Sequence, residues 1–471
     1  MVFSSLIFLF IFLPFVLVGY FTLRNSYRNY FLLFVSLFFY AYGEPSYVLV
    51  MLSSILANYI FGILVSNTNL IYRKISIILA VTFNLGMLGV FKYSGFIIEN
   101  INEFLGTSLQ SPNVSLPLGI SFFTFQALSY VIDVYRMEVK PQRNIFDLAL
   151  YISLFPQLVA GPIVRYQTVA DEIKSRKHSI EGFSEGVNRF MIGMFKKVLI
   201  ANPLGGIADS VFALPTQDIS LATTWIGILA YSLQIFFDFS GYSDMAIGLG
   251  KMFGFNFLEN FNYPYISKSV SEFWRRWHMS LGSFFRDYVY IPLGGNKVGP
   301  IRLYFNLFVV WMLTGFWHGA AWNFIAWGLY FGLFIALEKA FLGKLLKRVS
   351  PIISHTYLLL IVIIGWVFFR APDFTYAINY IKNMLGIGVN ALYDNLTIIY
   401  LHDSYIVFIL GILFSTPIVK YIKNIILKKK PVLINNVGFY ILQSSVYIAL
   451  FLLVIITLVN SSYNPLLYFR F

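Results

Sequence analysis

Apolar residues run along most of this chain in long blocks instead of the one-sided stripes of soluble helices. Blocks of about 18 or more apolar residues are long enough to cross a bilayer as a helix. The pattern therefore predicts an all-α, polytopic membrane protein. The predicted spans cover residues 5–23, 30–42, 46–65, 75–91, 116–135, 188–211, 219–245, 303–317, 320–338, 352–369, 403–420 and 437–459.

One apolar segment does not fit a simple span. Residues 146–164 are apolar, but Pro156, Gly161 and Pro162 interrupt them and polar sequence follows directly. Irregular backbone at membrane depth has to be buried in protein or line a cavity, because lipid cannot satisfy its hydrogen bonds. The sequence predicts a re-entrant element here.

Basic residues gather in alternate loops, and this pattern predicts the orientation. Lys and Arg collect in the loops of membrane proteins that face the cytoplasm. One assignment satisfies this rule with both termini outside, and its weak point is the 188–211 span, which carries Lys196 and Lys197. The loops that it places inside cover residues 24–28, 73–74, 136–143, 251–302, 339–348 and 420–430.

Composition agrees with a single membrane domain over residues 1–471. The chain is 58% hydrophobic and 12% charged, whereas soluble domains carry about 25% charged residues. No long polar stretch separates two apolar regions. The loops account for the net charge of +13, which therefore indicates no nucleic-acid partner. The absence of cysteine excludes disulfides, a thiolate nucleophile and a cysteine metal site.

His318 is the first candidate for chemistry. It lies in the apolar string WMLTGFWHGAAWNFIAWG, and an ionisable residue at membrane depth is by default a functional candidate. The alternative is a histidine whose hydrogen bonds hold helices together. The small residues Gly319, Ala320 and Ala321 leave room beside the ring for a substrate, or equally for a neighbouring helix.

His278 lies in the mixed string SVSEFWRRWHMSLGSFFRDYVYIPLGG, close to Arg275 and Arg276. Trp and Arg often anchor a protein at the membrane interface, which is one interpretation. The other is a cytoplasm-facing basic site for the phosphate of a donor, because guanidinium groups pair well with phosphate. No metal site is predicted, because the chain has no cysteine and no histidine pair at i,i+4 spacing.

Polar groups also interrupt three other apolar segments, and these are interpreted as structural. Asp238 and Asp244 lie in FFDFSGYSDMA, and buried carboxylates of this kind are expected to pair with basic residues. The other two segments contain Gln157 in LFPQLVAGPIV and Asp133 with Arg136 in YVIDVYR.

Five strings follow one another along the chain: PLGISFFTFQALSYVIDVYR, FPQLVAGPIVR, FDFSGYSDMAIGLGKMFGF, FWRRWHMSLGSFFRDYVYIPLGGN and LTGFWHGAAWNFIAWG. Taken in this order, they resemble one known family. They are similar to the membrane-bound O-acyltransferases, and within these to the bacterial alginate O-acetyltransferase branch. The branch that transfers D-alanine to teichoic acid shares the RRWH and WHG strings.

This resemblance implies a fold and a set of site residues. The fold is a ring of about 11–13 spans with re-entrant helices and a thinned centre, where a cytoplasmic tunnel meets an outer pocket. By the same likeness His318 is the catalytic residue and His278 a second functional position. Histidine's reference pKa of ~6.5 suits a base that takes a proton from a hydroxyl near neutral pH. The aromatic tail at 464–471 is similar to tails of this branch, and Tyr468 is its candidate acyl relay.

The sequence thus predicts a membrane acyltransferase of the bacterial inner membrane. It would move an acyl group, expected to be acetyl, from a cytoplasmic thioester to an extracytoplasmic polysaccharide, with Arg275 and Arg276 on the donor phosphates. Acetyl-CoA or another acyl thioester is the expected donor, and no bound cofactor is expected. The expected partners are membrane lipid, an extracytoplasmic SGNH-type acetyltransferase and the polysaccharide synthesis machinery. The alternatives are D-alanyl transfer to teichoic acid, a lipid or glycan transporter, and a scaffold for an extracellular transferase.

Overall fold

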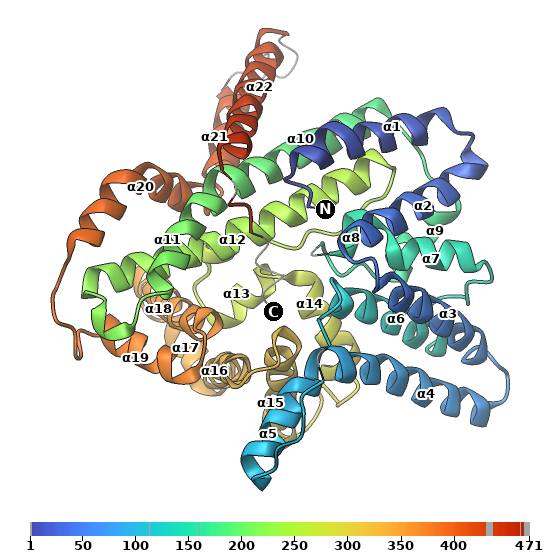
Figure 1. Ribbon diagram of the computed structural model, residues 1–471, viewed down its shortest axis with the longest axis horizontal. Coiled ribbons are helices and arrows are strands. Elements are labelled where there is room, and N and C mark those ends of the chain that lie inside the picture. The colour runs from blue at the N-terminus through green and yellow to red at the C-terminus, as the bar shows by residue number, and fades with distance from the viewer. Residues whose placement is uncertain (1, 113, 160, 430–436, 462, 466–471) are drawn as a thin grey trace. The chain divides into compact units, whose positions relative to one another are not determined.

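The computed structural model describes residues 2–112, 114–159, 161–429, 437–461 and 463–465 (Figure 1). These residues form helices, turns and extended connections without any strand, which confirms the all-α prediction. They divide into two compact units. Unit 1 comprises residues 1–190 and 243–258, and unit 2 comprises residues 191–242 and 259–471.

Unit 1 is built from the N-terminal helices. In order they are η1 Phe8–Phe12, α1 Leu13–Thr22, α2 Asn25–Gly43, α3 Val48–Leu64, α4 Leu70–Leu88, η2 Gly89–Tyr93, α5 Ser94–Leu105, α6 Ile120–Tyr135, α7 Ile145–Ser153, α8 Phe155–Leu158, α9 Tyr166–Lys174 and most of α10 Ile180–Phe195. Within this unit α2 packs against α7, while α6 packs against both α3 and α4 (Figure 1). Helix α6 lies in the middle of this packing and is buried on almost all sides.

The chain of unit 1 breaks where the sequence predicts a break. Helix α7 ends at Ser153, and Leu154 leaves the helical region with ψ 112° before the single turn α8. Arg165, just before α9, has extended backbone with φ −84° and ψ 150°. The interruption within residues 146–164 is thus confirmed, and its re-entrant path through a membrane stays a prediction.

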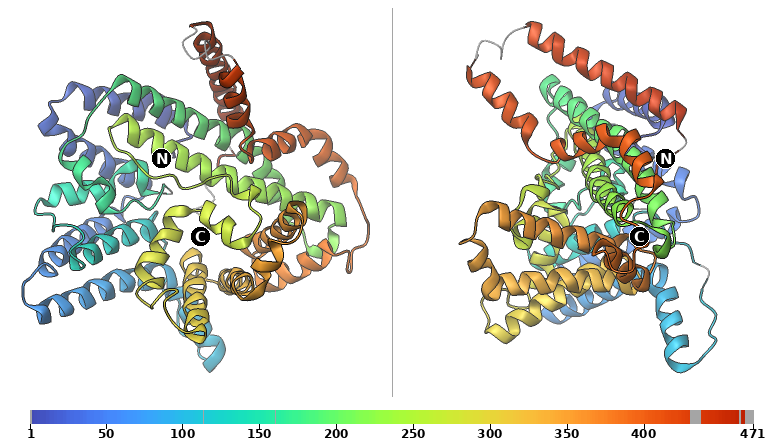
Figure 2. Two further views of the ribbon diagram at one scale, coloured as in Figure 1. Left: turned by 180° about the vertical axis from the view of Figure 1, so that it is seen from behind. Right: turned by 90° about the vertical axis from the view of Figure 1, so that its left-hand side faces the viewer.

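Unit 2 contains the short helices of the polar segment and the C-terminal helices. In order its elements are η3 Lys196–Ala201, α11 Asn202–Phe212, η4 Thr216–Asp218, the first part of α12 Leu221–Met252, η5 Pro264–Ile266, α13 Val270–Arg276, α14 Met279–Phe285, η6 Arg286–Tyr290, α15 Pro300–His318, α16 Trp322–Leu337, η7 Glu338–Leu342, α17 Gly343–Leu346, α18 Pro351–Arg370, α19 Phe374–Met384, α20 Asn395–Phe414, α21 Ile418–Lys429 and α22 Val437–Asn460. Helices α15 and α16 form a tight hairpin, and α18 packs along α16 (Figures 1 and 2).

The core of unit 2 is aromatic. Trp327, Phe331 and Trp366 are at most 1% exposed, and the rings of Trp327 and Trp366 lie 6.2 Å apart between centroids. Rings of this size bury large apolar areas and prefer offset-stacked or edge-on contacts. They fill the space between α16 and α18, so the residues at the end of α15 lie next to closely packed aromatic rings.

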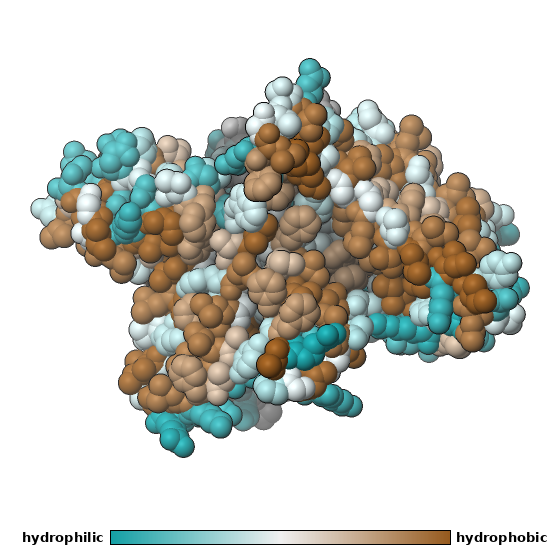
Figure 3. Space-filling view, turned by 90° about the horizontal axis from the view of Figure 1, so that it is seen from below, coloured by the Kyte–Doolittle hydropathy of each residue, from teal (hydrophilic) through white to brown (hydrophobic). Residues whose placement is uncertain are grey.

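Seven helical stretches among the described residues are long and apolar enough to cross a membrane, which agrees with a multi-pass membrane protein. Hydrophobic side chains also cover much of the face in Figure 3. The predicted spans 30–42 and 303–317 fall inside α2 and α15, helices of 19 residues outside this group of seven. Three shorter apolar helices are Phe8–Thr22, Val48–Leu64 and Ile120–Tyr135, and the seven stretches are Leu70–Leu105, Ile180–Phe212, Leu221–Met252, Trp322–Leu346, Pro351–Arg370, Asn395–Phe414 and Ile441–Asn460.

Helix α20 begins earlier than the predicted span 403–420. The Asp394 side chain accepts a hydrogen bond from the Thr397 backbone N–H at 2.8 Å, and the Thr397 hydroxyl accepts one from the Asp394 N–H at 3.2 Å. This reciprocal capping box satisfies N–H groups that the first turn of a helix leaves open. The polar pair His402 and Asp403 therefore lies within the helix, and its side chains are exposed.

The buried carboxylates pair with basic residues, as the sequence predicts. In unit 2 Lys197 forms an ion pair with Asp238, and both side chains are at least 95% buried. In unit 1 the guanidinium of Arg189 lies 2.6 Å from Asp244. Lys197, one of the two lysines that make the 188–211 span difficult to assign, therefore has a buried counter-charge. A charge within a membrane helix requires such a partner.

Candidate functional site

The hairpin of α15 and α16 places His318 through a close approach of two backbones. A Cβ added to Gly315 would lie 2.3 Å from the carbonyl oxygen of Phe324, and one added to Gly328 would lie 2.3 Å from that of Trp311. Only glycine allows the helices to approach so closely at these positions. His318 is the last residue of α15, one turn after Gly315, so this contact fixes where its ring begins.

The turn after His318 packs directly against helix α16. A Cβ added to Gly319 would lie 2.1 Å from the ring of Phe324 in α16. The backbone of Gly319 is extended, which ends α15, and Ala321 is extended too, just before α16 begins. Of the two interpretations of these small residues, room for a helix is the one that holds at Gly319.

The ring of His318 lies among aromatic side chains. Its centroid is 5.0 Å from that of Trp317, 5.0 Å from that of Trp327 in α16, and 5.2 Å from that of Phe369 in α18. The residue is 5% exposed. Water has little access here, and electrostatic interactions with a reacting group are stronger in such a site than in water.

His278 joins α13 to α14 in a conformation that few residues adopt. Its φ of 44° and ψ of 53° lie in the left-handed region, which is uncommon for a residue other than glycine. Such a conformation costs free energy and persists where the surroundings enforce it. Here the Asn260 side chain enforces it, because it lies 3.2 Å from the His278 Nδ1 and accepts hydrogen bonds from the backbone and side chain of Ser280.

The hydrogen bonds around Asn260 define the proton position on His278. The backbone N–H of Ser280 can only donate, and it bonds to the Asn260 Oδ1 at 3.1 Å, so the amide oxygen faces this side. The ring nitrogen that faces the same oxygen must then carry the proton. Nε2 is left as the bare nitrogen of a neutral imidazole, and it has no hydrogen-bond partner among the residues that the structure describes.

Burial keeps this imidazole neutral. His278 is 2% exposed, and burial lowers its pKa to about 3. The charged form would have to give up its hydration without a carboxylate in contact. At neutral pH His278 can therefore accept a hydrogen bond at Nε2 and donate one from Nδ1.

The structure brings the two sequence-predicted histidines together. Their ring centroids lie 6.5 Å apart, and the Trp317 ring lies 6.0 Å from that of His278 and 5.0 Å from that of His318. The residues that hold the pair were not predicted. Asn260 is one of several asparagines in a polar stretch, and nothing in its spacing distinguishes it from the others.

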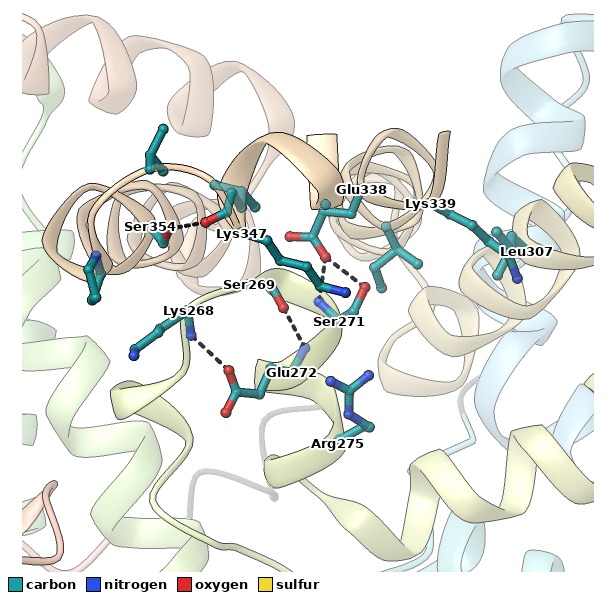
Figure 4. A pocket seen from close by; sticks show the side chains of 15 residues that line it. Lys268, Ser269, Ser271, Glu272, Arg275, Leu307, Glu338, Lys339, Lys347 and Ser354 are labelled. Carbon is teal, nitrogen blue, oxygen red and sulfur yellow. Dashed lines mark hydrogen bonds between the residues drawn. The ribbon is translucent and has the colours of Figure 1, made fainter. Parts of the chain in front are cut away.

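The two predicted phosphate-binding arginines have different surroundings. Arg276 is held by its own helix, with its guanidinium 3.0 Å from the Glu272 carboxylate and also bonded to the Asn262 carbonyl at 3.2 Å. Arg275 instead is exposed and lines a cavity of about 630 Å³ beside α13 (Figure 4). Of the two, Arg275 is the one that a ligand in this cavity can reach.

This cavity carries an excess of positive charge. Its two carboxylates are already engaged: Glu272 bonds to Arg276, while the buried Glu338 accepts hydrogen bonds from the backbone N–H groups of Val270 and Ser271. A cluster of basic groups with few free counter-charges favours anions. The basic residues around the cavity are Lys268, Arg275, Lys339 and Lys347 (Figure 4).

Tyr468, the candidate acyl relay, lies outside the described residues. The segment before it is described up to Pro465. Within that segment the Tyr463 hydroxyl donates a hydrogen bond to the Asp209 carboxylate at 2.7 Å. The tail is thus attached to unit 2 close to the end of α22.

Comparisons with known proteins agree with these motifs. Residues 137–369 match the model of MBOAT, the membrane-bound O-acyltransferase family, and this range includes both histidines. A relative from Pseudomonas putida, described as probable alginate O-acetylase AlgI, is 39% identical over the full length of both chains. A peptidoglycan O-acetyltransferase from Helicobacter pylori is 35% identical over 82% of this chain and 80% of its own. A teichoic acid D-alanyltransferase from Bacillus subtilis is 31% identical over 48% of this chain and 59% of its own.

Proposed function

Since the chain belongs to the membrane-bound O-acyltransferase family, we propose that it acetylates hydroxyl groups of an extracytoplasmic polysaccharide, with His318 as the general base. The chain is an O-acyltransferase and a multi-pass membrane protein. The observation that carries the proposal is the buried pair of His278 and His318, with ring centroids 6.5 Å apart.

The polysaccharide class follows from the relatives. The names of two of them describe O-acetylation of alginate and of peptidoglycan, and both polymers are built on glycan chains. The D-alanyltransferase matches a smaller share of this chain, 48% against 100% and 82%. The relatives therefore favour acetyl transfer to a glycan over D-alanyl transfer to teichoic acid.

The geometry suits acyl transfer from a thioester to an acceptor hydroxyl at His318. The imidazole takes the proton of an acceptor hydroxyl while its oxygen attacks the thioester carbonyl, so the new C–O bond forms as the C–S bond breaks. The proton then passes to the departing thiolate, which leaves as a thiol. General-base catalysis of this kind typically contributes about 10²–10⁴-fold in rate. The rings of Trp327 and Phe369 exclude water that would hydrolyse the thioester.

His278 would assist His318 by forming a hydrogen bond to the substrate. Its neutral ring presents Nε2 as an acceptor, while Asn260 fixes the ring through Nδ1. We assign it the role of orienting a substrate hydroxyl or thiol toward His318 by hydrogen bonding. Positioning of this kind supplies rate by proximity.

The donor would be bound from the cytoplasmic side. The loops at 251–302 and 339–348, which the positive-inside rule places in the cytoplasm, supply the basic residues of the cavity beside α13. Arg275 there is available for the phosphates of acetyl-CoA or of another acyl thioester, and Arg276 supports the helix instead. No resident cofactor is required.

Transfer across the membrane completes the proposal. With both termini outside the bacterial inner membrane, the C-terminal tail lies on the side of the polysaccharide. Tyr468 would accept the acyl group from the donor as a tyrosyl ester with the help of His318. An SGNH-type acetyltransferase outside would then pass it to the polymer made by the synthesis machinery.

A reconstituted assay tests this function. Protein in liposomes is supplied with acetyl-CoA on one side and with alginate, peptidoglycan fragments or teichoic acid on the other. We expect thioester consumption with acetyl appearing on a glycan or on the protein itself. Movement of a lipid or glycan across the bilayer without thioester consumption would instead identify a transporter.

A further inference from the structure

The last described residues of the chain are held by a set of polar contacts within unit 2. They follow α22 along the chain. Three residues of η3 and α11, spaced along one side of that continuous helix, each contact this tail. Tyr463 donates to Asp209 at 2.7 Å, the Asn202 amide donates to Asn464 at 3.3 Å, and the Lys197 ammonium donates to the Pro465 carbonyl.

The contact at Pro465 belongs to a buried ion pair. Lys197 and Asp238 have side chains that are 2% and 5% exposed, and each belongs to a helical stretch long enough to span a membrane. A charge at that depth is costly and is retained where it has a task. The Lys197 ammonium has three donors, and it directs one to Asp238 and another to the backbone of the tail.

The contact at Tyr463 leads toward the histidine site. The Asp209 carboxylate accepts from the Tyr463 hydroxyl with one oxygen and from the Arg370 guanidinium with the other, both at 2.7 Å. Arg370 ends α18 directly after Phe369, whose ring lies 5.2 Å from that of His318. The tail is therefore linked to the proposed base through a hydrogen bond, an ion pair, two consecutive residues of α18 and one ring contact.

The helix surface under Tyr463 is shaped for it. A Cβ added to Gly205 would lie 2.9 Å from the Tyr463 hydroxyl and 2.5 Å from the Gln234 amide nitrogen. Any larger side chain would push the tyrosine away from Asp209. The absence of a side chain at Gly205, together with the polar contacts on either side of it, indicates a surface that is complementary to the tail.

We propose that Lys197, Asn202, Asp209, Asp238 and Arg370 form a C-terminal dock that keeps residues 463–465 in place throughout the reaction, with Lys197 as a positioning residue. The inference rests on the proposed acyl transfer for its activity measurement. It does not require that Tyr468 is the relay. Its content is that residues 463–465 stay on η3 and α11 during acyl transfer and do not detach to meet a partner.

Cross-linking tests whether the tail stays docked. Because the chain contains no cysteine, Asn202→Cys with Asn464→Cys adds the only two thiols. A short methanethiosulfonate cross-linker joins them and dithiothreitol releases them, and each single-cysteine variant is the control. We expect a cross-link in the membrane, and acyl transfer by the cross-linked protein within about twofold of the same protein after reduction. An activity that falls about tenfold or more and returns on reduction would overturn the proposal.

A second variant separates positioning from folding. Lys197→Met with Asp238→Leu removes both charges, and replacing a buried pair by apolar residues is often tolerated. We expect kcat to fall about tenfold with the donor KM unchanged, and the 202–464 cross-link to restore most of it. A merely structural role would not be rescued by the tether. If this variant does not fold, Tyr463→Phe, which deletes one hydroxyl, takes its place with the same tether rescue expected.

The two proposals fail in different ways. Cross-link formation is read on a gel and requires no activity, so an absent cross-link overturns the dock even in an active enzyme. A protein that cross-links as expected but never consumes a thioester overturns the proposed function and leaves the docked tail in place. Full activity in the uncharged variant, or a loss that the tether does not restore, overturns the positioning role of Lys197.

Discussion

The Nδ1 of His278 lies 3.2 Å from the Oδ1 of Asn260, and this contact determines which ring nitrogen is available for a substrate. The same amide oxygen accepts from the Ser280 backbone, so the asparagine cannot turn without losing a second hydrogen bond. The chemistry of the site depends on this fixed orientation as much as on the histidine itself.

Asn260→Ala should therefore slow the reaction without changing the catalytic groups. Loss of the acceptor frees the His278 ring to rotate or to move its proton to the other nitrogen. We expect kcat to fall about tenfold or more, with a smaller change in the donor KM. The matched control is Asn262→Ala. The Asn262 side chain is exposed, and the hydrogen bond that Asn262 accepts from Arg276 goes to its backbone carbonyl, which the substitution keeps. Equal losses in the two variants would contradict the orienting role.

The low pKa of His278 predicts a dependence of stability on pH. The folded protein keeps this histidine neutral down to about pH 3, whereas the unfolded chain binds a proton near pH 6.5. Below pH 6.5 the unfolded state thus binds more protons, and stability falls as the pH is lowered from 6.5 toward 3. Each pH unit in that window costs at most about 1.4 kcal/mol. Thermal unfolding of wild type should show this extra loss, and His278→Gln should lack it.

Arg275 and Arg276 should differ in what their loss affects. Arg275→Ala removes a cation from the cavity beside α13, so we expect the donor KM to rise about tenfold while the acceptor KM stays the same. Arg276→Ala breaks the bond to Glu272 and should lower thermal stability slightly, with little change in either KM. Initial-rate kinetics with each substrate varied in turn distinguish these outcomes. A pattern in which both substrates suffer equally from Arg275→Ala would return this arginine to an interfacial role.

The glycine contact of the hairpin should be sensitive to a single methyl group. Gly315→Ala places a Cβ 2.3 Å from a carbonyl of α16, so the helices must separate at the residue pair that positions His318. We expect a loss of about 1–3 kcal/mol in stability and a clear loss of activity. Gly206→Ala in α11 is the control, because nothing lies within 4 Å of its added Cβ, and it should be neutral or slightly stabilising. Unfolding midpoints of the two variants give the comparison.

Much of the architecture was predictable because membrane helices leave a strong signal. Long apolar blocks predicted the all-α fold and most spans, and the apolar setting of His318 singled it out. The basic partners of Asp238 and of Asp244 were predictable because a lone buried charge has a high free-energy cost. The start of α20 was missed, because the predicted span began only after the polar residue His402, whereas the helix begins at Asn395, directly after the capping box at Asp394.

The precise surroundings of the site could not be predicted. His278 contacts Asn260 because of the turn between α13 and α14. In that turn the backbone of His278 is in the left-handed region, which no residue pattern predicts. The room expected beside Gly319 is filled by Phe324, because the hairpin closes more tightly than small residues by themselves indicate. Tertiary contacts of this kind arise from packing between segments, which a pattern along one segment does not encode.

Acyl transfer by purified His318→Ala tests the role of this histidine most directly. We expect its kcat to fall by about 10²–10⁴-fold, the usual contribution of a general base, while its thermal unfolding stays near that of wild type. His402→Ala, at a histidine that is exposed on α20, should keep wild-type activity. A folded His318→Ala protein that retains most of its activity would contradict the central claim that this histidine is the base.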